Sequence, residues 1–496
     1  MRYFRKFILL PAAAILAAIS VFAQQEPEQV LTLTLKQAIE LARQQSPDII
    51  WVRHNFRSSY WNYIYHKANY KPSLIFSSNP NFNHSINAIT LPDGKLQYVN
   101  QNYLTTNARL YIFQNIALTG GTLSLQTSLD RIDQLDDKSL FYRSSPLILT
   151  YDQALFGYNS LKWNKKIAPL GFEAAKRYYV EMTEYVSQMA AARFFSLAKA
   201  QINLEIAQTN YKNADMQFTV AQGRYDIGSI TENEMLRLEI SKLSGETELL
   251  NAGLSVDNDM QNLRSYLGII NSIPIRVIID YSLPLETISP EKAMECAMEN
   301  STEVISFQQR KLQSESGVAY AKAITGLQAN LHMQIGMSQR GADIPTAYRD
   351  PMNTQYATVG ITLPILDWGK SKGQVQMAKS RRDMELAQIE QEQNNFEMNV
   401  FRLVKQFNLQ SNRLHIASIT DEKAERNNEV TQQLYLLDRV LINDLNAAIT
   451  AKDQAKRDYI QSLSEYWNLY YYLRSVTLFD FEKDMPLTED YENLIK

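Results

Sequence analysis

The sequence is poor in cross-linking residues and in excess charge of either sign. It contains one cysteine, Cys296, among 496 residues. A lone cysteine excludes any disulfide within the chain, and we expect it to pack as a small apolar residue. Basic and acidic residues nearly balance, at 50 and 53, and no basic run occurs, which argues against a nucleic-acid partner. After residue 23 no window of 18 apolar residues occurs, so we expect no membrane-spanning helix there.

Signatures of catalysis are missing as well. The five histidines share no metal-binding spacing, and neither His-Glu-x-x-His nor Gly-x-Ser-x-Gly occurs. Gly369-Lys370-Ser371 is similar to the end of a phosphate-binding loop, but Pro364 stands where that loop needs glycine. We therefore expect no enzymatic activity, no metal and no cofactor.

The N-terminal segment is typical of a secretory signal peptide spanning residues 1–23. Arg2, Arg5 and Lys6 precede an apolar run, and Ala23 offers a small residue at the cleavage position. An exported chain with neither disulfides nor a membrane helix is expected to be periplasmic or to form a β-barrel in an outer membrane.

Two segments of the sequence occur twice. Residues 34–48 align without gaps on residues 289–303, and Thr34 and Ser289 are suitable helix N-caps. Residues 225–235 align on residues 435–445. These matches predict two structural repeats, residues 24–270 and 289–475, joined by a linker at 271–288 and followed by a periplasmic tail at 476–496.

Strand patterns lie in the first part of each repeat. In the first repeat, four candidates fall within 72–155, at about 72–86, 104–117, 122–132 and 145–155. In the second, two alternating runs fall within 330–366, and the link at 338–355 carries the Gly, Asp and Pro residues of an exposed loop. Runs of 9 to 11 residues match the ~9–11 residues of a tilted transmembrane strand.

Long helical hairpins are predicted after the strands, at about 160–268 and 368–475. Apolar residues in the second hairpin follow coiled-coil spacing, at Ile389, Phe396, Val400, Leu403, Phe407 and Leu414. Met398, Phe401 and Leu409 lie off that seam, which indicates contacts on two sides of the helix. More than 60 helical residues give a rod of roughly 90–100 Å.

Four to six strands cannot close a barrel, because closure takes about eight strands and open edges leave unpaired amides in lipid. Several chains must therefore share one barrel. The predicted fold class is an α+β membrane protein, with a shared outer-membrane β-barrel of 4–6 strands per protomer. That barrel continues into a long periplasmic α-helical coiled-coil barrel, and each protomer contains two internal repeats.

Several motifs together resemble the TolC-like outer membrane efflux proteins, or outer membrane factors, over essentially the whole mature chain. They are Leu35-x-x-Ala38-Ile-x-x-Ala42 with its repeat, Gln153-Ala-Leu155-Phe156, Leu363-Pro-Ile365-Leu366-Asp-Trp-Gly369, Tyr225-x-x-Gly228 and Tyr435-x-x-Asp438. The resemblance implies a homotrimer in outer-membrane lipid that docks a periplasmic adaptor and an inner-membrane transporter. The implied function is passive export of small molecules or proteins, in a tripartite efflux or type I secretion system.

The resemblance also implies a pore constriction formed by two acidic residues just past the second hairpin turn. These positions fall on Asp444 and Ala447, so only one of them is acidic here. Glu234 is the counterpart in the first repeat. The alternative interpretation is that each acid lies near a helix start, where it interacts favourably with the helix dipole.

The hairpin tips are candidates for gating or adaptor docking. The residues are Arg224, Tyr225, Asp226, Gly228, Tyr435, Asp438 and Arg439. Asp438 replaces the glycine that the family pattern expects. Ordinary solvated turn residues are the alternative.

Two aromatic groups, at residues 51–70 and 466–472, are expected near the membrane, either as an interfacial belt or as core packing. Two other protein classes remain open. A periplasmic adaptor also carries a long helical hairpin, but one rather than two. A coiled-coil structural protein would not explain the alternating strands.

Overall fold

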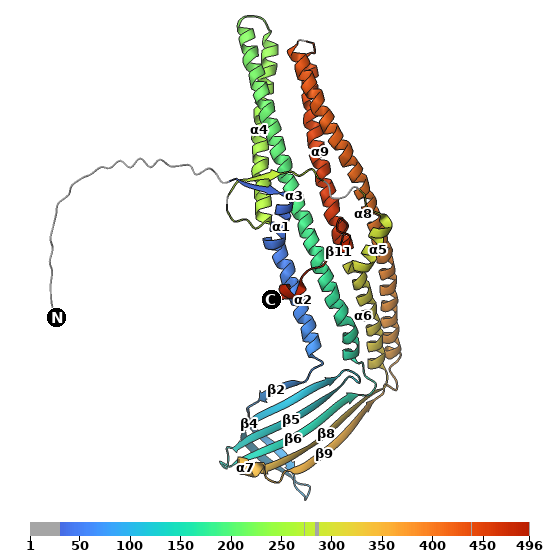
Figure 1. Ribbon diagram of the computed structural model, residues 1–496. Helices are drawn as coiled ribbons and strands as arrows, with labels where there is room; N and C mark the ends of the chain where they lie inside the picture. Colours follow the sequence, from blue (N-terminus) through green and yellow to red (C-terminus); the bar gives the residue numbers. More distant parts are fainter. Residues whose placement is uncertain (1–29, 272, 283–286, 438, 496) are drawn as a thin grey trace, which may run out of the picture.

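A computed structural model describes residues 30–271, 273–282, 287–437 and 439–495. The predicted signal peptide and Asp438 lie outside these residues. A long helical bundle stands on one β-sheet, and two helical hairpins point away from the sheet (Figure 1). None of the helices in the described ranges has a stretch long and apolar enough to cross a membrane.

The first half of the chain begins with β1 (Leu31–Thr34), α1 (Leu35–Gln45) and α2 (Pro47–Ala68). It then forms five strands: β2 (Ser73–Ser78), β3 (Asn81–Thr90), β4 (Leu96–Ile116), β5 (Gly121–Gln134) and β6 (Leu140–Ala154). The hairpin of α3 (Ser160–Asp226) and α4 (Glu232–Tyr266) follows.

The second half repeats this order with fewer strands. It contains β7 (Ile275–Ile278), α5 (Pro290–Asn300), α6 (Thr302–Thr325), β8 (Gln328–Gly341), α7 (Ile344–Ala347) and β9 (Met352–Thr362). The hairpin of α8 (Lys370–Leu436) and α9 (Ile442–Thr477) follows. The chain ends with β10 (Phe479–Asp480), β11 (Met485–Pro486) and α10 (Tyr491–Ile495).

The repeated helix starts form as the sequence predicts. Thr34 caps α1 by accepting a hydrogen bond from the Gln37 backbone N–H, and Ser289 caps α5 by accepting one from Lys292. The small residues that recur 255 positions apart are buried where these helices pack: Ala38, Ala42 and Ser46 in the first copy, and Ala293, Ala297 and Ser301 in the second. Small side chains at these positions let the helices approach closely.

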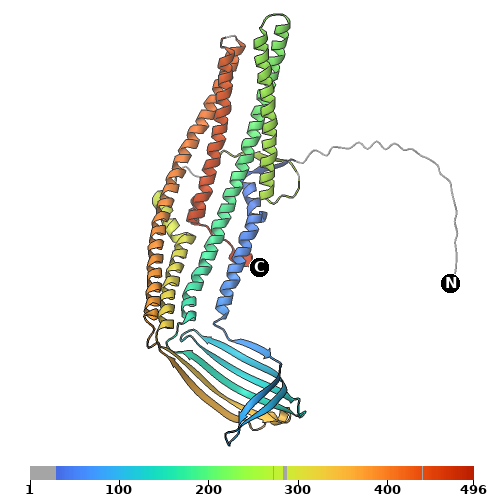
Figure 2. The ribbon, with the colours of Figure 1, turned by 180° about the vertical axis from the view of Figure 1, so that it is seen from behind.

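The large sheet is antiparallel, with the order β2-β4-β5-β6-β8-β9 and with β3 beside β4. Strands of both repeats therefore form one sheet, joined where β6 pairs with β8. Figure 2 shows the sheet at one end of the helices, and among the described elements only α7 packs substantially on it. A second, two-stranded sheet pairs β1 in parallel with β7, which lies in the segment predicted as a linker.

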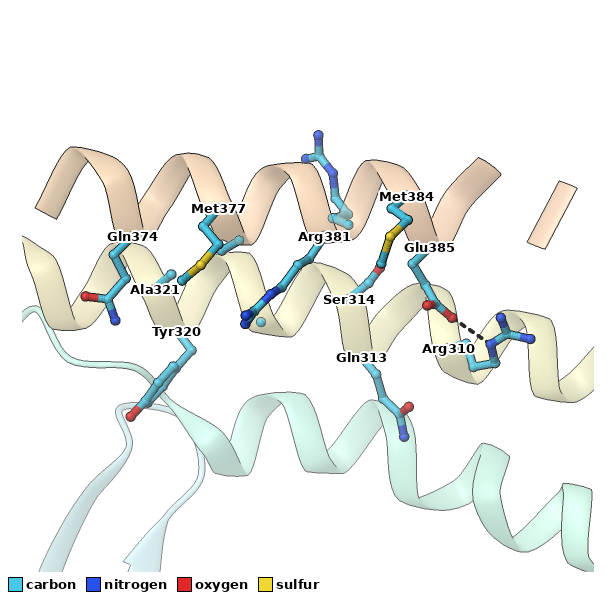
Figure 3. Close-up of a pocket in the computed structure, with 13 residues that line it drawn as sticks. Arg310, Gln313, Ser314, Tyr320, Ala321, Gln374, Met377, Arg381, Met384 and Glu385 are labelled. Atoms are coloured by element: carbon cyan, nitrogen blue, oxygen red, sulfur yellow. Dashed lines mark hydrogen bonds and ion pairs between the residues drawn. The ribbon is translucent and has the colours of Figure 1, made fainter. Parts of the chain in front are cut away.

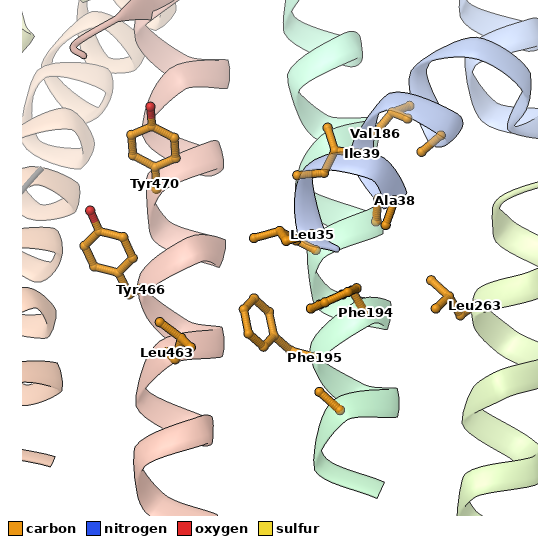
Figure 4. Close-up of a cluster of buried hydrophobic side chains, with 14 of the residues drawn as sticks. Leu35, Ala38, Ile39, Val186, Phe194, Phe195, Leu263, Leu463, Tyr466 and Tyr470 are labelled. Atoms are coloured by element: carbon orange, nitrogen blue, oxygen red, sulfur yellow. The ribbon is translucent and has the colours of Figure 1, made fainter. Parts of the chain in front are cut away.

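The core lies between the helices rather than against the sheet. Buried side chains of α1, α3, α4 and α9 meet in one cluster, which includes Phe194, Phe195, Leu263 and Tyr466 (Figure 4). The predicted seam of α8 is confirmed, since all six of its residues are buried. Both α3 and α8 span 67 residues, which corresponds to a rod of about 100 Å.

Charged side chains tie the two repeats together inside this core. Glu184 on α3 accepts hydrogen bonds from Arg43 on α1 at 2.6 Å and from Arg474 on α9 at 2.8 Å. Arg474 also pairs with Asp480 on β10 at 2.8 Å. Together the hydrogen bonds and the charges of Glu184 and Asp480 outweigh the effect of burial and raise the pKa of Arg474 above its ordinary value.

Three expectations need correction. The link at 338–355 is not wholly an exposed loop, because it contains α7, whose Ala347 is buried against the end of the sheet. Leu363 and Ile365 lie beyond the end of β9 and do not continue its alternation. The aromatic end of α9 follows the core-packing alternative, since Tyr466 and Tyr470 are buried, but it lies halfway along the bundle rather than near the sheet.

Candidate channel-forming surfaces

One face of the large sheet is apolar although it is exposed. Strand register places a continuous set of apolar residues on this face, which includes Leu74, Phe76, Leu110, Ile112, Leu123, Leu125, Leu147, Leu149, Met333, Ile335, Met337, Ala357, Val359 and Ile361. The large ones among them are 37% to 68% exposed, so no part of the chain that the structure describes covers them. No charged residue shares this face across the band from Leu123 to Leu129 of β5, whereas Arg131 and Asp133 lie beyond it. Such an uncovered apolar band indicates an apolar environment outside the chain.

The opposite face of the same strands carries the charged groups. Asp130 on β5 accepts hydrogen bonds from Asn107 on β4 and, at 2.6 and 2.8 Å, from Arg143 on β6. His332 on β8 contacts the Asp152 carboxylate at 2.5 Å and the Tyr356 hydroxyl at 2.9 Å. Arg109 and Arg340 share this face through their strand partners. The sheet therefore separates an apolar surface from a polar one.

The two outer edges of the sheet are open in the single chain. At one edge β2 and β3 pair only with β4, and at the other β9 pairs only with β8, among the strands that the structure describes. Open edges expose backbone N–H and C=O groups that another strand could pair.

Two helices carry exposed apolar stripes as well. On α4 the stripe follows coiled-coil spacing, at Leu236, Ile240, Leu243, Leu250 and Leu254, all exposed. On α8 the predicted off-seam residues Met398, Phe401 and Leu409 are exposed as well. The views of Figures 1 and 2 place α4 and α8 on opposite sides of the bundle. Each stripe is thus a helix-packing surface without a partner among the residues that the structure describes.

A groove of about 630 Å³ lies between α6 and α8. Figure 3 shows Met377 and Met384 of α8 and Tyr320 of α6 along it, with Arg381 reaching between the two helices. Arg310 on α6 is held by Glu385 of α8 at 2.6 Å, and Glu392 also pairs with it. Met384 of this groove lies 14 residues before Met398, so heptad spacing places both on the same side of α8.

The two hairpin tips close in the same way. The Ser229 N–H donates to the Arg224 carbonyl at 2.8 Å, and the Arg439 N–H donates to the Leu434 carbonyl at 2.9 Å. The two bonds lie 210 positions apart, the offset found in the sequence, and both are typical of a Schellman helix end. Gly228 has a φ of +71° and provides the left-handed residue of the first tip.

The remaining tip residues are exposed and point to no internal lock. The side chains of Arg224, Tyr225, Asp226, Tyr435 and Arg439 make no hydrogen bond or ion pair with any other residue in the described ranges. The tips of both hairpins lie at the end opposite the sheet (Figure 1). The chain therefore leaves these groups available to other molecules.

The two acidic candidates cap the second helix of each hairpin. The Glu234 carboxylate accepts hydrogen bonds from the Thr231 backbone N–H at 2.9 Å and hydroxyl at 3.1 Å, which lower its pKa. The Asp444 carboxylate accepts one from the Leu441 N–H at 3.1 Å. Both acids are exposed, as is Ala447. Helix capping accounts for both local positions and still leaves each carboxylate at the surface.

Several solved structures are similar to the chain. The Campylobacter jejuni outer membrane channel CmeC matches with a TM-score of 0.65 at 14% identity, over 93% of this chain and 88% of that one. The Vibrio cholerae outer membrane protein VceC matches with a TM-score of 0.60 at 15% identity, over 89% and 95%. The open state of the Neisseria gonorrhoeae outer membrane channel MtrE gives 0.58 at 13%, over 89% and 88%.

The chain has the fold of these outer-membrane channels. This confirms, at the level of fold, both the family resemblance and the α+β fold class expected from the sequence. No protein-family model matches the sequence, and no match is found among curated proteins.

One part of the outer-membrane channel fold was missed by the sequence analysis. The strand expected at 104–117 begins at Leu96 and forms a hairpin with β3. The signal was available, because Pro92-Asp93-Gly94 is a turn sequence and Gly94 adopts a φ of +81°. The polar side of this hairpin, rich in Asn and Gln, weakened the alternation that marks a strand.

Proposed function

We propose that three copies of this chain form a passive duct that crosses the outer membrane and the periplasm. The duct serves as the outer-membrane component of a tripartite efflux or type I secretion system and exports small molecules or proteins. The apolar face of the sheet faces lipid, the charged face lines a water-filled lumen, and the helices continue the passage into the periplasm. Residues 1–23 direct export and are removed, and each of the two repeats supplies one helical hairpin.

The proposal rests on the difference between the two faces of the sheet, one of which is apolar while the other carries the charged groups. A sheet in water needs no continuous exposed apolar face, and such a face would promote aggregation. A transmembrane barrel requires this pattern, with apolar residues outward and polar residues inward along each strand. The paired Asp130 and Arg143 lie on the side that would face water.

Assembly into a ring follows from the two unlike edges. The β2/β3 edge and the β9 edge differ, so one copy can join the next head to tail, and the contact closes into a ring. The exposed stripes of α4 and α8 extend the same contact along the bundle. Each contact between the β9 edge of one copy and the β2/β3 edge of the next pairs backbone N–H and C=O groups. Unpaired, these groups would face lipid, where each costs free energy.

Fractionation followed by bilayer recording tests the function. We expect a heat-sensitive trimer in the outer-membrane fraction, which gives discrete conductance steps after reconstitution in a planar bilayer. The matched variants are Leu125→Asp on the apolar face and Ser124→Asp on the polar face, at neighbouring positions of β5. The first is expected to abolish membrane insertion and the second to preserve it. A soluble protein that does not conduct would favour an adaptor, and a filament would favour a structural coiled coil.

Docking of an adaptor and its inner-membrane transporter is proposed at the hairpin tips, through Arg224, Tyr225, Asp226, Tyr435 and Arg439. The tips project farthest from the sheet, and these side chains have no partner in the described part of the chain. Alanine variants are expected to weaken co-purification of the adaptor without reducing trimer formation. Unchanged co-purification of all five variants would contradict the docking role. Gly228 and Asp438, which the internal repeat of the sequence aligns with each other, belong to the same proposed region.

The constriction is proposed at Asp444, with Ala447 one turn away and Glu234 as the weaker candidate. Three carboxylates brought together in a ring would attract cations and impede anions. Asp444→Asn tests this role because asparagine keeps the oxygen that caps α9 and loses only the charge. We expect weaker block by divalent cations, while Glu234→Gln serves as the comparison at the first tip. If cation block is the same in wild type and Asp444→Asn, this residue does not form the constriction.

A further inference from the structure

We propose that the outer end of the duct is an eighteen-stranded barrel, with six strand positions from each copy, and that it admits bulky hydrophilic cargo. The inference rests on the proposed trimeric duct and specifies its pore. It derives from the strand register within one chain.

The first step is that β2 and β3 occupy one strand position. Ser78 pairs with Ala108, and Asn81 pairs with Thr105, so the register against β4 continues across the two intervening residues without a slip. Pro80 lies in that gap and lacks the N–H that would complete the pairing. The six positions are therefore β2/β3, β4, β5, β6, β8 and β9.

The second step is that β4 belongs to the same sheet along its full contact with β5. Pairing runs from Tyr103 and Gln134 to Ile116 and Gly121, which covers the whole of β5. A narrower barrel, built from β5, β6, β8 and β9 alone, would need a free β5 edge. That edge is occupied, so the next copy meets β2/β3 instead.

The third step is that both faces continue through the extra strands. Leu110 and Ile112 of β4, with Leu74 and Phe76 of β2, extend the apolar face. Asn107 of β4 contacts Asp130 of β5 on the charged face. A hairpin folded away from the membrane would need neither the lipid-type face nor this link.

The strand number sets the width of the pore. For strands about 4.8 Å apart and tilted by about 40°, eighteen strands give a backbone radius of about 18 Å, against about 12 Å for twelve. Side chains occupy about 5 Å of that radius, which leaves open radii of about 13 and 7 Å. The wider lumen admits bulky solutes.

The lining decides the chemical class of the cargo. The charged residues named on this face are mixed in sign: Asp130 and Asp152 are acidic, Arg109, Arg143 and Arg340 are basic, and Asp130 pairs with Arg143. The polar face therefore offers water-compatible groups without a strong net charge. Such a lining accepts hydrophilic cargo and selects little by sign of charge.

Disulfide cross-linking between copies tests the seam. Ser77 of β2 and Ser128 of β5 are matched, because both lie on the charged face and both pair with Arg109. Each is changed to cysteine together with Thr354→Cys or Thr358→Cys on β9, in a Cys296→Ala background. Ladders up to a trimer are expected for Ser77→Cys and are not expected for Ser128→Cys.

The possible failures can be told apart. Ladders from Ser128→Cys, or none from Ser77→Cys in a protein that still conducts, would overturn the wide barrel and leave the proposed duct intact. A protein that neither assembles into a trimer nor conducts would contradict both the wide barrel and the proposed duct. Independently, a polyethylene glycol of about 10 Å hydrodynamic radius should enter from the barrel side and lower the conductance, because it fits the wider lumen only. Its exclusion would also overturn the proposal.

Discussion

Removing the charge of Glu184 should destabilise the bundle more than any exposed charge substitution on the same helix. Glu184 has a side chain only 3% exposed, and it holds Arg43 and Arg474 from two other helices. In Glu184→Gln the amide oxygen can serve one arginine, while its NH2 group faces the other. Breaking a buried ion pair in this way costs about 3–5 kcal/mol, because a charge stays buried without its partner.

The measurable consequence is a shift in thermal unfolding. A chain of this length has an unfolding entropy of roughly 1 kcal/mol per kelvin, so the loss corresponds to a decrease in Tm of about 3–5 °C. Circular dichroism of the helical signal in detergent measures it. Glu173→Gln is the control on α3, since Glu173 is 42% exposed and pairs with Lys176 and Arg177 only at the surface. Its Tm is expected to fall by about 1 °C or less.

A double variant separates the cost of an unpaired charge from the loss of the ion pair. Glu184→Met with Arg474→Met replaces both partners by apolar side chains and leaves Asp480 bonded to backbone N–H groups of Glu482 and Lys483. The free energy of unfolding lost in this double variant should be smaller than the sum of the losses in Glu184→Met alone and Arg474→Met alone. Equal decreases in Tm for Glu184→Gln and Glu173→Gln would refute the stabilising role of the buried ion pair. Strictly additive losses in the double variant would refute it as well.

Two further predictions concern the α8 surfaces and acid stability. Phe407→Ala removes a fully buried ring and should lower the free energy of unfolding by about 3–5 kcal/mol. Phe401→Ala, at an exposed position of the same helix, should instead weaken trimer association, as measured by the temperature at which the trimer dissociates. Burial opposes ionisation of Asp480, but the hydrogen bond and charge of Arg474 prevail and lower its pKa. The stability that Asp480 contributes is thus present above about pH 4 and is lost as the pH falls through the lowered pKa, so Asp480→Asn should flatten the acid limb of the stability curve.

The repeats and the helical rods could be predicted because local chemistry determines them. Thr34 and Ser289 start their helices through their own side chains, and the α8 seam from Ile389 to Leu414 follows from spacing along one helix. The alternation of apolar with polar or small residues from Leu331 to Met337 could likewise be predicted, because it depends only on which side of one strand each side chain faces. The candidate tip residues followed from turn sequences and from the internal repeat.

The contacts between different strands and helices could not be predicted from local sequence in the same way. The sequence placed the aromatic end of α9 near the membrane, but Tyr466 packs among the buried residues of α1 and α3, far along the chain. The polar segment before residue 104 gave no alternation, although it pairs with β3. The burial of Tyr466 depends on residues distant in sequence, so no local pattern encodes it, whereas the β3–β4 hairpin had a local turn signal but lacked the alternation that marks a strand.

By itself, the sequence determined a chain of two copies, each with strands and a long helical hairpin, because capping, periodicity and turn residues act within a few positions. Tertiary structure alone decided that β6 joins β8, that β2 and β3 form one edge strand, and that Glu184 links three helices. These features depend on strand register and on the approach of distant segments. A shift of one residue in register would exchange the two faces of a strand, and the local sequence of that strand would remain the same.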